Sequence, residues 1–535
     1  GGFRHKAPYP KNIKHLPKPP KTTADFQPNT PLKGSPLGWP CTPEDLFVTD
    51  DGAPVRIDKA FSWEYPLAVH GLMHNVITNA WRGDPYPIDT LFIFMSNLAW
   101  NSSMNTSKVR EMLVDKDEGG EYKIPFIVVC DAFSSETVQF ADLVLPDTTY
   151  LERHDVMSML DRPISEYDGP VDSVRVPILP VKDGCKPFQD VVVELASRLK
   201  LPKFTNDDGT RKFKDYPDFV INYETAPDSG VGFLSGWRGK DGTKSLKGEP
   251  NPKQWEMYAA NNCFHHYVMP KEHQYMRNFN RGYQEWAVEM GFLTQVEPLT
   301  LAIYCEDLQH FKLAAEGKRE GRQPPDALRD RIKTYFDPLP FYYRPLEENL
   351  SDLTKFPLNA VTQRPMAMYH SWDSQNAWLR QIHAHNYLYI NAQTAEAAGI
   401  ADEDWIWVES MHGKIRCMCK LSEAVEPGTV WSWNAIGKAS GAWGLSNDSN
   451  ESQKGFLLNH LIAEELPSNG EFKHLSNSDP VTGQAGWYDV RVRIYKAEAG
   501  EEQQTLPQFS PAKPYPGMKK SRPKWLTYFA GKGAK

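Results

Sequence analysis

The sequence is poor in cysteine and has no excess of positive charge. Only 7 of its 535 residues are cysteines, and their irregular spacing does not predict a disulfide framework. Cys417 and Cys419 stand two apart in a predicted strand. No second pair completes a tetrahedral metal site, so we expect both to be small packing residues. The formal net charge of −8 argues against a nucleic-acid binder, because phosphates attract cationic surfaces.

Long apolar runs and the common nucleotide-binding loops are also missing. No run of about 18 apolar residues occurs, so we expect no membrane-spanning helix. The start, Gly1 to Lys6, lacks Met and the apolar core of a signal peptide, and it is typical of the middle of a longer protein. The absence of GxGxxG and Walker sequences disfavours an ordinary dinucleotide or ATP fold. The chain is instead rich in proline (43), tyrosine (23) and tryptophan (16), as expected for long ordered loops over a scaffold.

The first part of the chain has the pattern of an α/β fold. Residues 1–60 read as an extended, proline-rich and basic connector. Three short apolar runs then alternate with helical stretches, which predicts a parallel sheet covered on both faces. We expect this nucleotide-binding domain over residues 61–200. The apolar runs are 91–95, 124–130 and 141–145, and the helical stretches are 66–81, 107–114 and 187–200.

The second part of the chain has a different residue pattern. Residues 201–360 show no clear period, and we expect an irregular excursion that contacts a partner. Over residues 361–495, short strands alternate with turns and one small helix, which predicts a closed β-barrel. Residues 496–535 read as a tail. The predicted fold class is therefore α/β, with a parallel-sheet domain followed by a carboxy-terminal barrel.

Polar side chains follow each of the three predicted strands. Ligands of parallel α/β sheets bind beyond the carboxyl ends of the strands, where carboxylate, amide and hydroxyl groups can meet the donors and acceptors of a nucleotide. The same residue types also cap helices and turns, so the pattern leaves both roles open. The candidate nucleotide contacts are Ser96, Asn97, Asn101, Asp131, Ser134 and Asp147.

One segment resembles a family signature. Residues 141–146, Ala-Asp-Leu-Val-Leu-Pro, followed by Glu152, resemble the ADxxLP…E signature of the dimethyl-sulfoxide-reductase family of molybdenum enzymes. Residues 94–97 are similar to that family's strand and loop on the guanine of one pterin nucleotide, and residues 129–133 are similar to its next strand. Cys130 joins the implied cofactor contacts, although many relatives carry a polar residue there. Residues 388–428 are similar to the family's double-psi barrel.

The resemblance also implies pterin contacts from three loops of the barrel. Matching segments cover most of residues 90–200 and 360–495, in the order of the family. The polar loop at 370–376 and the later loops at 459–461 and 479–484 correspond to the family's pterin-binding loops. The implied pterin contacts are His370, Ser371, Trp372, Ser374, Gln375, Asn376, Asn459 and Gln484.

A molybdenum bis(molybdopterin guanine dinucleotide) cofactor is therefore implied. The family's upstream half carries the molybdenum ligand and the cysteines of a [4Fe-4S] cluster, and neither has a counterpart in this sequence. No catalytic residue and no metal ligand is assigned for that reason. As partners we expect the amino-terminal half, a ferredoxin-like iron–sulfur subunit, and by analogy a membrane-anchor subunit. The expected location is cytoplasmic, peripheral at the inner membrane through such partners.

The start of the chain and the polar loop at 370–376 look most like those of membrane-associated sulfite dehydrogenase large subunits. The expected reaction is oxidation of sulfite, a small oxyanion, to sulfate by oxygen-atom transfer, with electrons passed to iron–sulfur clusters. Reduction of polysulfide, thiosulfate or tetrathionate is the alternative within the family. A noncatalytic scaffold that only holds cofactor, or a barrel-bearing binding protein without molybdenum, also stays open.

Overall fold

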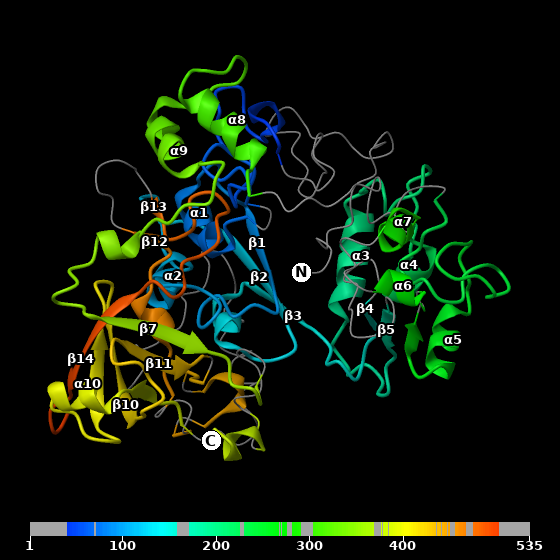
Figure 1. The fold of residues 1–535 in the computed structure, drawn as a ribbon. Coiled ribbons are helices and arrows are strands. Elements are labelled where there is room, and N and C mark those ends of the chain that lie inside the picture. The colour runs from blue at the N-terminus through cyan, green and yellow to red at the C-terminus, as the bar shows by residue number, and fades with distance from the viewer. Residues whose placement is uncertain are drawn as a thin grey trace. The chain divides into compact units, whose positions relative to one another are not determined.

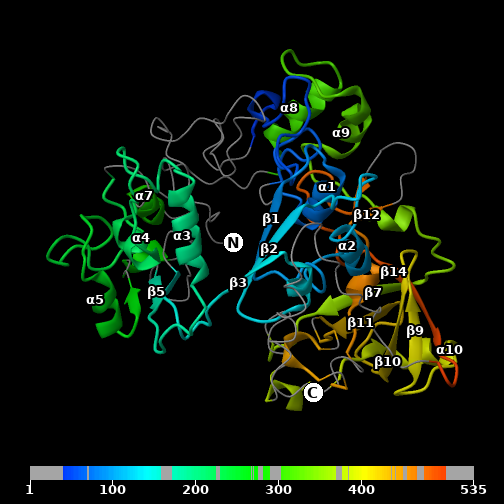
Figure 2. The same cartoon turned by 180° about the vertical axis from the view of Figure 1, so that it is seen from behind.

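A computed structural model describes residues 40–501, apart from 69–70, 158–170, 225–228, 267, 269, 275–280, 290–302, 369–375, 377, 384, 435, 440, 447, 450–454 and 467–474. Figure 1 shows the fold, and Figure 2 shows it from behind. The chain divides into two compact units. The barrel unit comprises residues 50–144, 324–335 and 341–535, and the middle unit comprises residues 1–49, 145–323 and 336–340.

The first two strands of the predicted parallel sheet belong to the barrel unit. β1 (Thr90–Phe94) and β2 (Phe126–Asp131) pair in parallel, and the sheet order is β1-β2-β3, with β3 spanning Leu143–Pro146. Helices α1 (Val76–Arg82) and α2 (Thr106–Met112) pack on one face of the sheet. Their apolar side chains share a buried cluster with Ile93, Ile127 and Val129. The three apolar runs therefore predicted the strands correctly, but the expected cover on both faces is absent from the described part of this chain, because Phe92 and Leu143 are 38% and 43% exposed.

The helix that was predicted from residue 66 begins only at Val76. Gly71 has a left-handed φ of 67°, and a Cβ added to it would lie 2.2 Å from Asp58 Oδ2. A side chain at this position would be strained and would meet the carboxylate, so the backbone turns there and does not continue as a helix. α1 ends at Gly83, whose φ of 69° is also left-handed, as is common at helix ends.

Six strands close into the predicted barrel, in the order β10-β8-β11-β7-β14-β9. The pairs β10–β8 and β11–β7 are parallel, and the other neighbouring pairs are antiparallel. Cys417 and Cys419 are fully buried in the barrel core beside Ile406 and Val430, which agrees with a packing role. The strands are β7 (Leu358–Gln363), β8 (Leu388–Ile390), β9 (Trp405–Glu409), β10 (Lys414–Leu421), β11 (Thr429–Trp433) and β14 (Arg491–Lys496).

Short elements complete the barrel unit. Asn391 begins the small helix α10 (Ala392–Ala397) by accepting a hydrogen bond from the Gln393 backbone N–H at 2.9 Å. The two-stranded sheet of β12 (Glu465–Leu466) and β13 (Leu475–Ser476) is antiparallel. Helix α9 (Arg329–Tyr335) also belongs to this unit.

The middle unit has its own sheet and core. β4 (Asp155–Met157), β5 (Val171–Arg175) and β6 (Phe264–His266) form an antiparallel sheet in the order β4-β5-β6. Val220, Leu234 and Tyr258 are fully buried in its core. Much of residues 201–360 therefore has regular structure that its sequence did not reveal. The helices are α3 (Phe188–Arg198), α4 (Tyr216–Asn222), α5 (Gln254–Ala260), α6 (Lys271–Gln274), α7 (Arg281–Glu289) and α8 (Glu306–Ala315).

Among the residues that the model describes, none of the helices combines the length and the apolar character needed to span a bilayer.

Candidate functional site

Asn97, at the end of β1, is tied to the segment that follows β2. Its Oδ1 accepts hydrogen bonds from the Thr137 backbone N–H at 3.2 Å and from Thr137 Oγ1 at 2.7 Å. Its Nδ2 donates to Glu136 Oε2 at 2.8 Å. Asn97 is buried, and so are both partners. These three bonds fix the carboxyl edge of the sheet, where ligands of parallel sheets bind.

Asp131 shapes the loop after β2. Its Oδ1 accepts from the Phe133 backbone N–H, and its Oδ2 accepts from Ser135 Oγ, both at 3.0 Å. The Ser134 side chain is half-buried, and the Phe133 ring is 37% exposed beside it. Cys130, the last apolar residue of β2, is fully buried. This turn therefore presents a hydroxyl and an aromatic face beside a buried carboxylate.

Segments that follow the barrel strand β11 reach the same edge. Glu136 Oε1 accepts from the Ala439 backbone N–H at 2.9 Å, and its Oε2 accepts from Trp443 Nε1 at 2.6 Å. The Ser134 carbonyl accepts from the Trp443 backbone N–H at 2.9 Å. The Phe133 and Trp443 ring centroids are 5.5 Å apart. The strand-end loops and the barrel thus meet in one site, as the family resemblance implies.

Asn459 joins a second barrel segment to the loop after β1. Its Nδ2 donates to the Ser103 carbonyl at 2.8 Å and lies 3.4 Å from the Asn101 carbonyl. The next residue, His460, is buried with its ring 5.6 Å from that of Trp100. Burial, with the nearby Arg110 guanidinium, lowers the pKa of His460 to about 3. His460 is therefore neutral near pH 7.

Several buried polar atoms in these segments have no hydrogen-bond partner in the part of the chain that the model describes. Asn101 Oδ1 is an acceptor and Trp433 Nε1 is a donor. Asn101 is itself a predicted nucleotide contact, and His460 follows the implied pterin contact Asn459. An unpaired buried polar group costs about 1–3 kcal/mol. A bound heterocycle with its own donors and acceptors would satisfy them, so the residues present fit such a group. The unpaired atoms in these segments are Asn101 Oδ1, Asn386 Oδ1, Ser432 Oγ, Trp433 Nε1, Asn434 Oδ1 and His460 Nε2.

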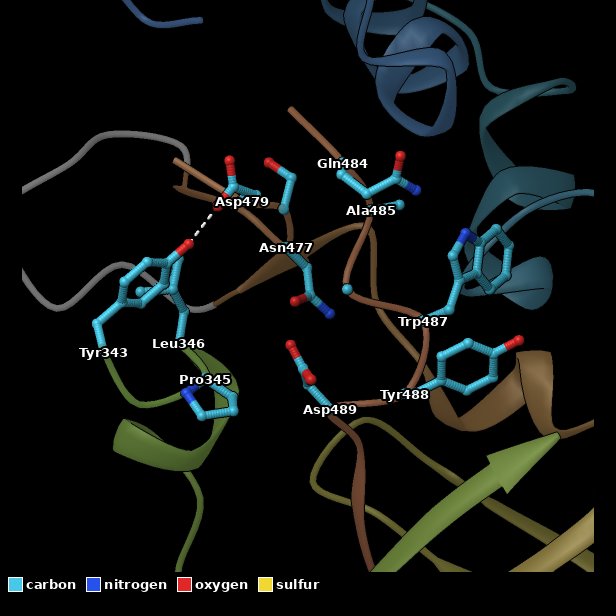
Figure 3. A pocket seen from close by; sticks show the side chains of 12 residues that line it. Tyr343, Pro345, Leu346, Asn477, Asp479, Gln484, Ala485, Trp487, Tyr488 and Asp489 are labelled. Atoms are coloured by element: carbon cyan, nitrogen blue, oxygen red, sulfur yellow. Dashed lines mark hydrogen bonds between the residues drawn. The ribbon is translucent and has the colours of Figure 1, made fainter. Parts of the chain in front are cut away.

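Gln484 is exposed and lines a cavity of about 220 Å³ in the barrel unit. Figure 3 shows Tyr343 on one side of this cavity, Trp487 and Tyr488 on the other, and Asp489 between them. Flat aromatic walls with carboxylate and amide groups between them suit a planar ring that carries N–H donors.

Two carboxylates of this cavity differ in their ionisation. Burial opposes the ionisation of Asp479, but hydrogen bonds from Tyr343 and Thr482 outweigh it and lower the pKa of Asp479. Burial, together with the charges of Glu347 and Glu348, raises the pKa of Asp489. The cavity therefore offers a hydrogen-bond acceptor in Asp479 and, in Asp489, a carboxyl group that gains a proton more readily than an exposed aspartate does.

Other predicted contacts lie elsewhere. Asp147 belongs to the middle unit, where its Oδ2 accepts from Arg153 at 2.6 Å and its Oδ1 accepts from the Phe188 backbone N–H at the start of α3. Asn376 is exposed and accepts from the Trp378 backbone N–H at 2.9 Å. Ser96 is half-buried. His370, Ser371, Trp372, Ser374 and Gln375 fall outside the described residues.

Glu136 was missed by the sequence reasoning, although it joins more of the site than any predicted residue. The signal that could have found it is an acidic residue in the short segment between two apolar strands. In the part of the chain that the model describes, no group of three or more His, Cys, Asp or Glu side chains is arranged to hold a metal ion.

Two family models match the chain, in regions that contain the sheet edge and the segments after β11. Residues 86–197 match the Molybdopterin oxidoreductase family, and residues 358–474 match the Molydopterin dinucleotide binding domain. The chain belongs to the molybdopterin oxidoreductases, which confirms the resemblance seen in the sequence.

Similar proteins agree with this assignment. The chain is 69% identical, over 99% of its length, to a sulfite dehydrogenase subunit of Allochromatium vinosum, and it covers 55% of that protein. It is 23% identical, over 72% of its length, to the molybdopterin-containing subunit of thiosulfate reductase of Salmonella typhimurium, of which it covers 43%. The chain therefore spans about half the length of the curated relatives that it matches.

A solved structure has a similar fold. Acetylene hydratase from Pelobacter acetylenicus aligns with a TM-score of 0.51 and 19% sequence identity, over 79% of this chain and 46% of the other. At this identity the likeness concerns the fold alone.

Proposed function

We propose that this chain is the carboxy-terminal part of the catalytic subunit of a molybdenum-bis(molybdopterin guanine dinucleotide) oxidoreductase that oxidises sulfite to sulfate. The observation that carries the proposal is the 69% identity to a sulfite dehydrogenase subunit over nearly the whole chain. In this proposal residues 61–200 form the nucleotide-binding domain and residues 361–495 form a double-psi barrel that binds pterin. Residues 1–60, 201–360 and 496–535 serve as connector, partner-contact region and tail.

The chain's own residues would bind and orient the cofactor. The edge formed by Ser96, Asn97 and Asn101, together with the loop of Cys130, Asp131 and Ser134, would hold the nucleotide. Asp147, which lies in the middle unit, would fix the start of α3 through its bond with the Phe188 backbone N–H. The pterin would contact Asn459 and Gln484, and the loop residues His370, Ser371, Trp372, Ser374, Gln375 and Asn376.

The bound molybdenum centre supplies two-electron chemistry for oxygen-atom transfer. The protein orients the cofactor with buried donors and acceptors and keeps water from these contacts. Neutral His460 and the unpaired Asn101 Oδ1 would give the cofactor one hydrogen-bonding edge of mixed character. The molybdenum ligand, and the [4Fe-4S] cluster that takes the electrons one at a time, would come from the amino-terminal half or from a partner.

The proposed partners follow from this division of labour. They are the amino-terminal half of the same enzyme, a ferredoxin-like iron–sulfur subunit, and a membrane-anchor subunit. We place the assembly in the cytoplasm, peripheral at the inner membrane. The Allochromatium vinosum relative is named as one subunit of its enzyme, which supports the presence of further subunits. Reduction of thiosulfate is the second candidate activity, because a thiosulfate reductase subunit is also similar to this chain.

The experiment is a substrate comparison on the chain purified with every polypeptide that co-purifies with it. Sulfite with an oxidised artificial acceptor tests the forward reaction, and thiosulfate with a reduced artificial donor tests the alternative. We expect sulfite-dependent reduction of the acceptor and no thiosulfate-dependent oxidation of the donor. Turnover with thiosulfate alone would overturn the substrate, and no turnover by a molybdenum-loaded assembly would favour a scaffold.

A further inference from the structure

Glu136 is a carboxylate with no exposed surface that joins two distant parts of the barrel unit. It lies at the start of the 3-10 helix Glu136–Phe140, directly after the loop of Asp131. Its exposed fraction is 0%. An ionised carboxylate is rarely buried so completely unless several donors compensate for the lost water.

Three donors surround this carboxylate. Asn97 Nδ2 and Trp443 Nε1 donate to Oε2 at 2.8 and 2.6 Å, and the Ala439 backbone N–H donates to Oε1 at 2.9 Å. Burial lowers the pKa of the nearby Arg110 guanidinium to about 10, and the negative charge of Glu136 offsets part of this lowering. Both oxygens therefore act as acceptors, as expected for an ionised side chain.

The donors come from two segments that are far apart in the sequence. Asn97 stands at the end of β1, whereas Ala439 and Trp443 belong to the post-β11 segment, defined here as residues 436–439 and 441–443. Trp100 Nε1 donates to the Gly437 carbonyl of the same segment at 3.0 Å. The Lys438 Nζ lies 3.9 Å from the centroid of the Trp443 ring and is fully buried.

We propose that Glu136 is a positioning residue, which fastens the post-β11 segment to the carboxyl edge of the sheet and thereby sets how long the pterin nucleotide stays bound. The proposal rests on the proposed function, since it assumes that this edge holds the cofactor. Glu136 does not itself need to touch the cofactor. It acts through Asn97, whose amide it orients, and through the turn at Ser134, whose carbonyl accepts from Trp443.

Glutamine cannot replace this carboxylate without loss. A glutamine has one acceptor oxygen and one NH₂ group, and each of the two positions faces at least one N–H donor. Whichever way the amide turns, at least one bond is lost and two donors face each other. The shape of the side chain is almost unchanged, so Glu136→Gln tests hydrogen bonding and charge at nearly constant volume.

The test compares Glu136→Gln with Glu118→Gln, an exposed glutamate that undergoes the same chemical change. Each variant is purified with its co-purifying polypeptides, and molybdenum, pterin and guanine nucleotide are measured per chain. Loaded samples are then diluted, and the release of pterin is followed by its fluorescence. Far-UV circular dichroism establishes that the variants are folded. We expect release about tenfold faster in Glu136→Gln, as a hydrogen bond to a charged group predicts, and no change in Glu118→Gln.

A second variant keeps the inference testable if Glu136→Gln does not fold. Trp443→Phe removes one donor and leaves the carboxylate and an aromatic ring in place, and we expect a smaller acceleration of release in the same direction. If folded Glu136→Gln, or Trp443→Phe in its place, releases pterin at the wild-type rate, the positioning role is wrong although the proposed function stands. If the wild-type assembly contains no pterin, the proposed function itself fails and the inference fails with it.

Discussion

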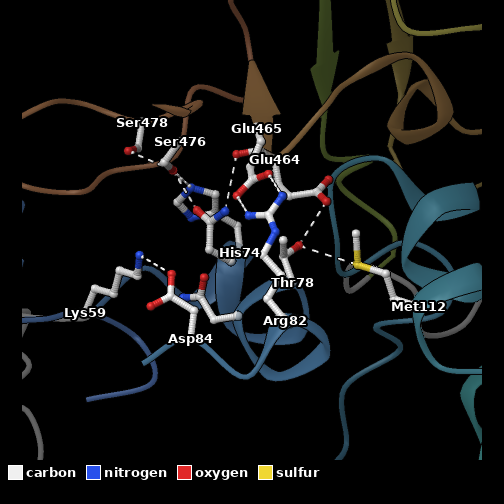
Figure 4. Close-up of polar contacts among 12 residues, drawn as sticks. Lys59, His74, Thr78, Arg82, Asp84, Met112, Glu464, Glu465, Ser476 and Ser478 are labelled. Carbon is white, nitrogen blue, oxygen red and sulfur yellow. Dashed lines mark hydrogen bonds and ion pairs between the residues drawn. The ribbon is translucent and has the colours of Figure 1, made fainter. Parts of the chain in front are cut away.

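Glu464 allows a quantitative prediction about pH. Figure 4 shows this residue beside α1, where Thr78 Oγ1 donates to its Oε1 at 3.0 Å. Its other oxygen, Oε2, is buried and has no hydrogen-bond partner in the described part of the chain. Burial raises the pKa of Glu464 from 4.5 to about 7. The neighbouring Glu465 is instead paired with Arg82.

The direction of the effect follows from the raised pKa. In the unfolded chain the Glu464 carboxyl loses its proton near pH 4.5, whereas in the folded protein it keeps the proton until about pH 7. Stability is therefore lost as the pH rises from 4.5 to 7, and the loss stays constant above pH 7. At 1.36 kcal/mol per pKa unit, the whole effect is about 3 kcal/mol.

Glu464→Gln removes the ionisable group and retains an acceptor for Thr78. We expect the difference in unfolding free energy between the variant and the wild type to rise by about 3 kcal/mol from pH 4.5 to pH 7.5, in favour of the variant. Urea unfolding at several pH values measures this difference. Hydrogen exchange of the α1 amides localises it, which matters because a chain with two units need not unfold in one step. Glu118→Gln is the exposed control.

A difference that stays flat over this pH range would refute the reasoning, because it would mean that the buried Glu464 carboxyl ionises as readily as a solvated one.

Three further predictions concern other polar groups. Arg153→Met removes the buried partner of Asp147 and should destabilise the middle unit by about 3 kcal/mol. The more exposed control Arg175→Met should cost less than about 1 kcal/mol. Equal losses of protease resistance in the two variants would disprove this. Burial lowers the pKa of His460 to about 3, so the wild type should lose stability as the pH falls below about 6.5. The His460→Phe variant should lose less stability over this range. Parallel acid-unfolding curves for the two proteins would contradict this expectation. Tyr343→Phe removes a hydrogen-bond donor to Asp479. The change should lower the free energy of unfolding by about 1 kcal/mol and raise the pKa of Asp479. An unchanged midpoint of urea unfolding at pH 7 would count against a stabilising role of that bond.

The fold was predictable where burial imposes a simple pattern. Continuous apolar runs predicted β1 and β2, as is typical of parallel strands, although only β2 is buried along most of its length. Short strands separated by turns predicted the barrel, and β9 shows the alternating burial of a strand with one face inside. The start of α1 was not predictable from its apolar spacing, since Gly71 turns the backbone to make room for Asp58, a contact that no local pattern reveals.

The sequence indicated candidate residues in the loops of the site, but not the contacts that join these loops. Asn97, Asp131 and Asn459 became candidates because polar residues after strands, and the order of the family's loops, point to them, and their cofactor contacts are a proposal. Glu136 was missed because its partners Ala439 and Trp443 lie about 300 residues away in the chain, and sequence spacing does not report such contacts. Most of the regular structure after residue 200 was missed because Phe219 of α4 packs against Phe204 and Phe213, which lie outside that helix, and sequence spacing does not report such contacts.

The central claim is that this chain holds a pterin nucleotide between its sheet edge and its barrel. The most direct measurement is the content of molybdenum, pterin and guanine nucleotide in the chain purified with its co-purifying polypeptides, expressed per mole of chain. We expect pterin and guanine nucleotide both to be released on denaturation, together with molybdenum. An assembly that contains this chain, is fully folded and carries neither pterin nor guanine nucleotide would contradict it.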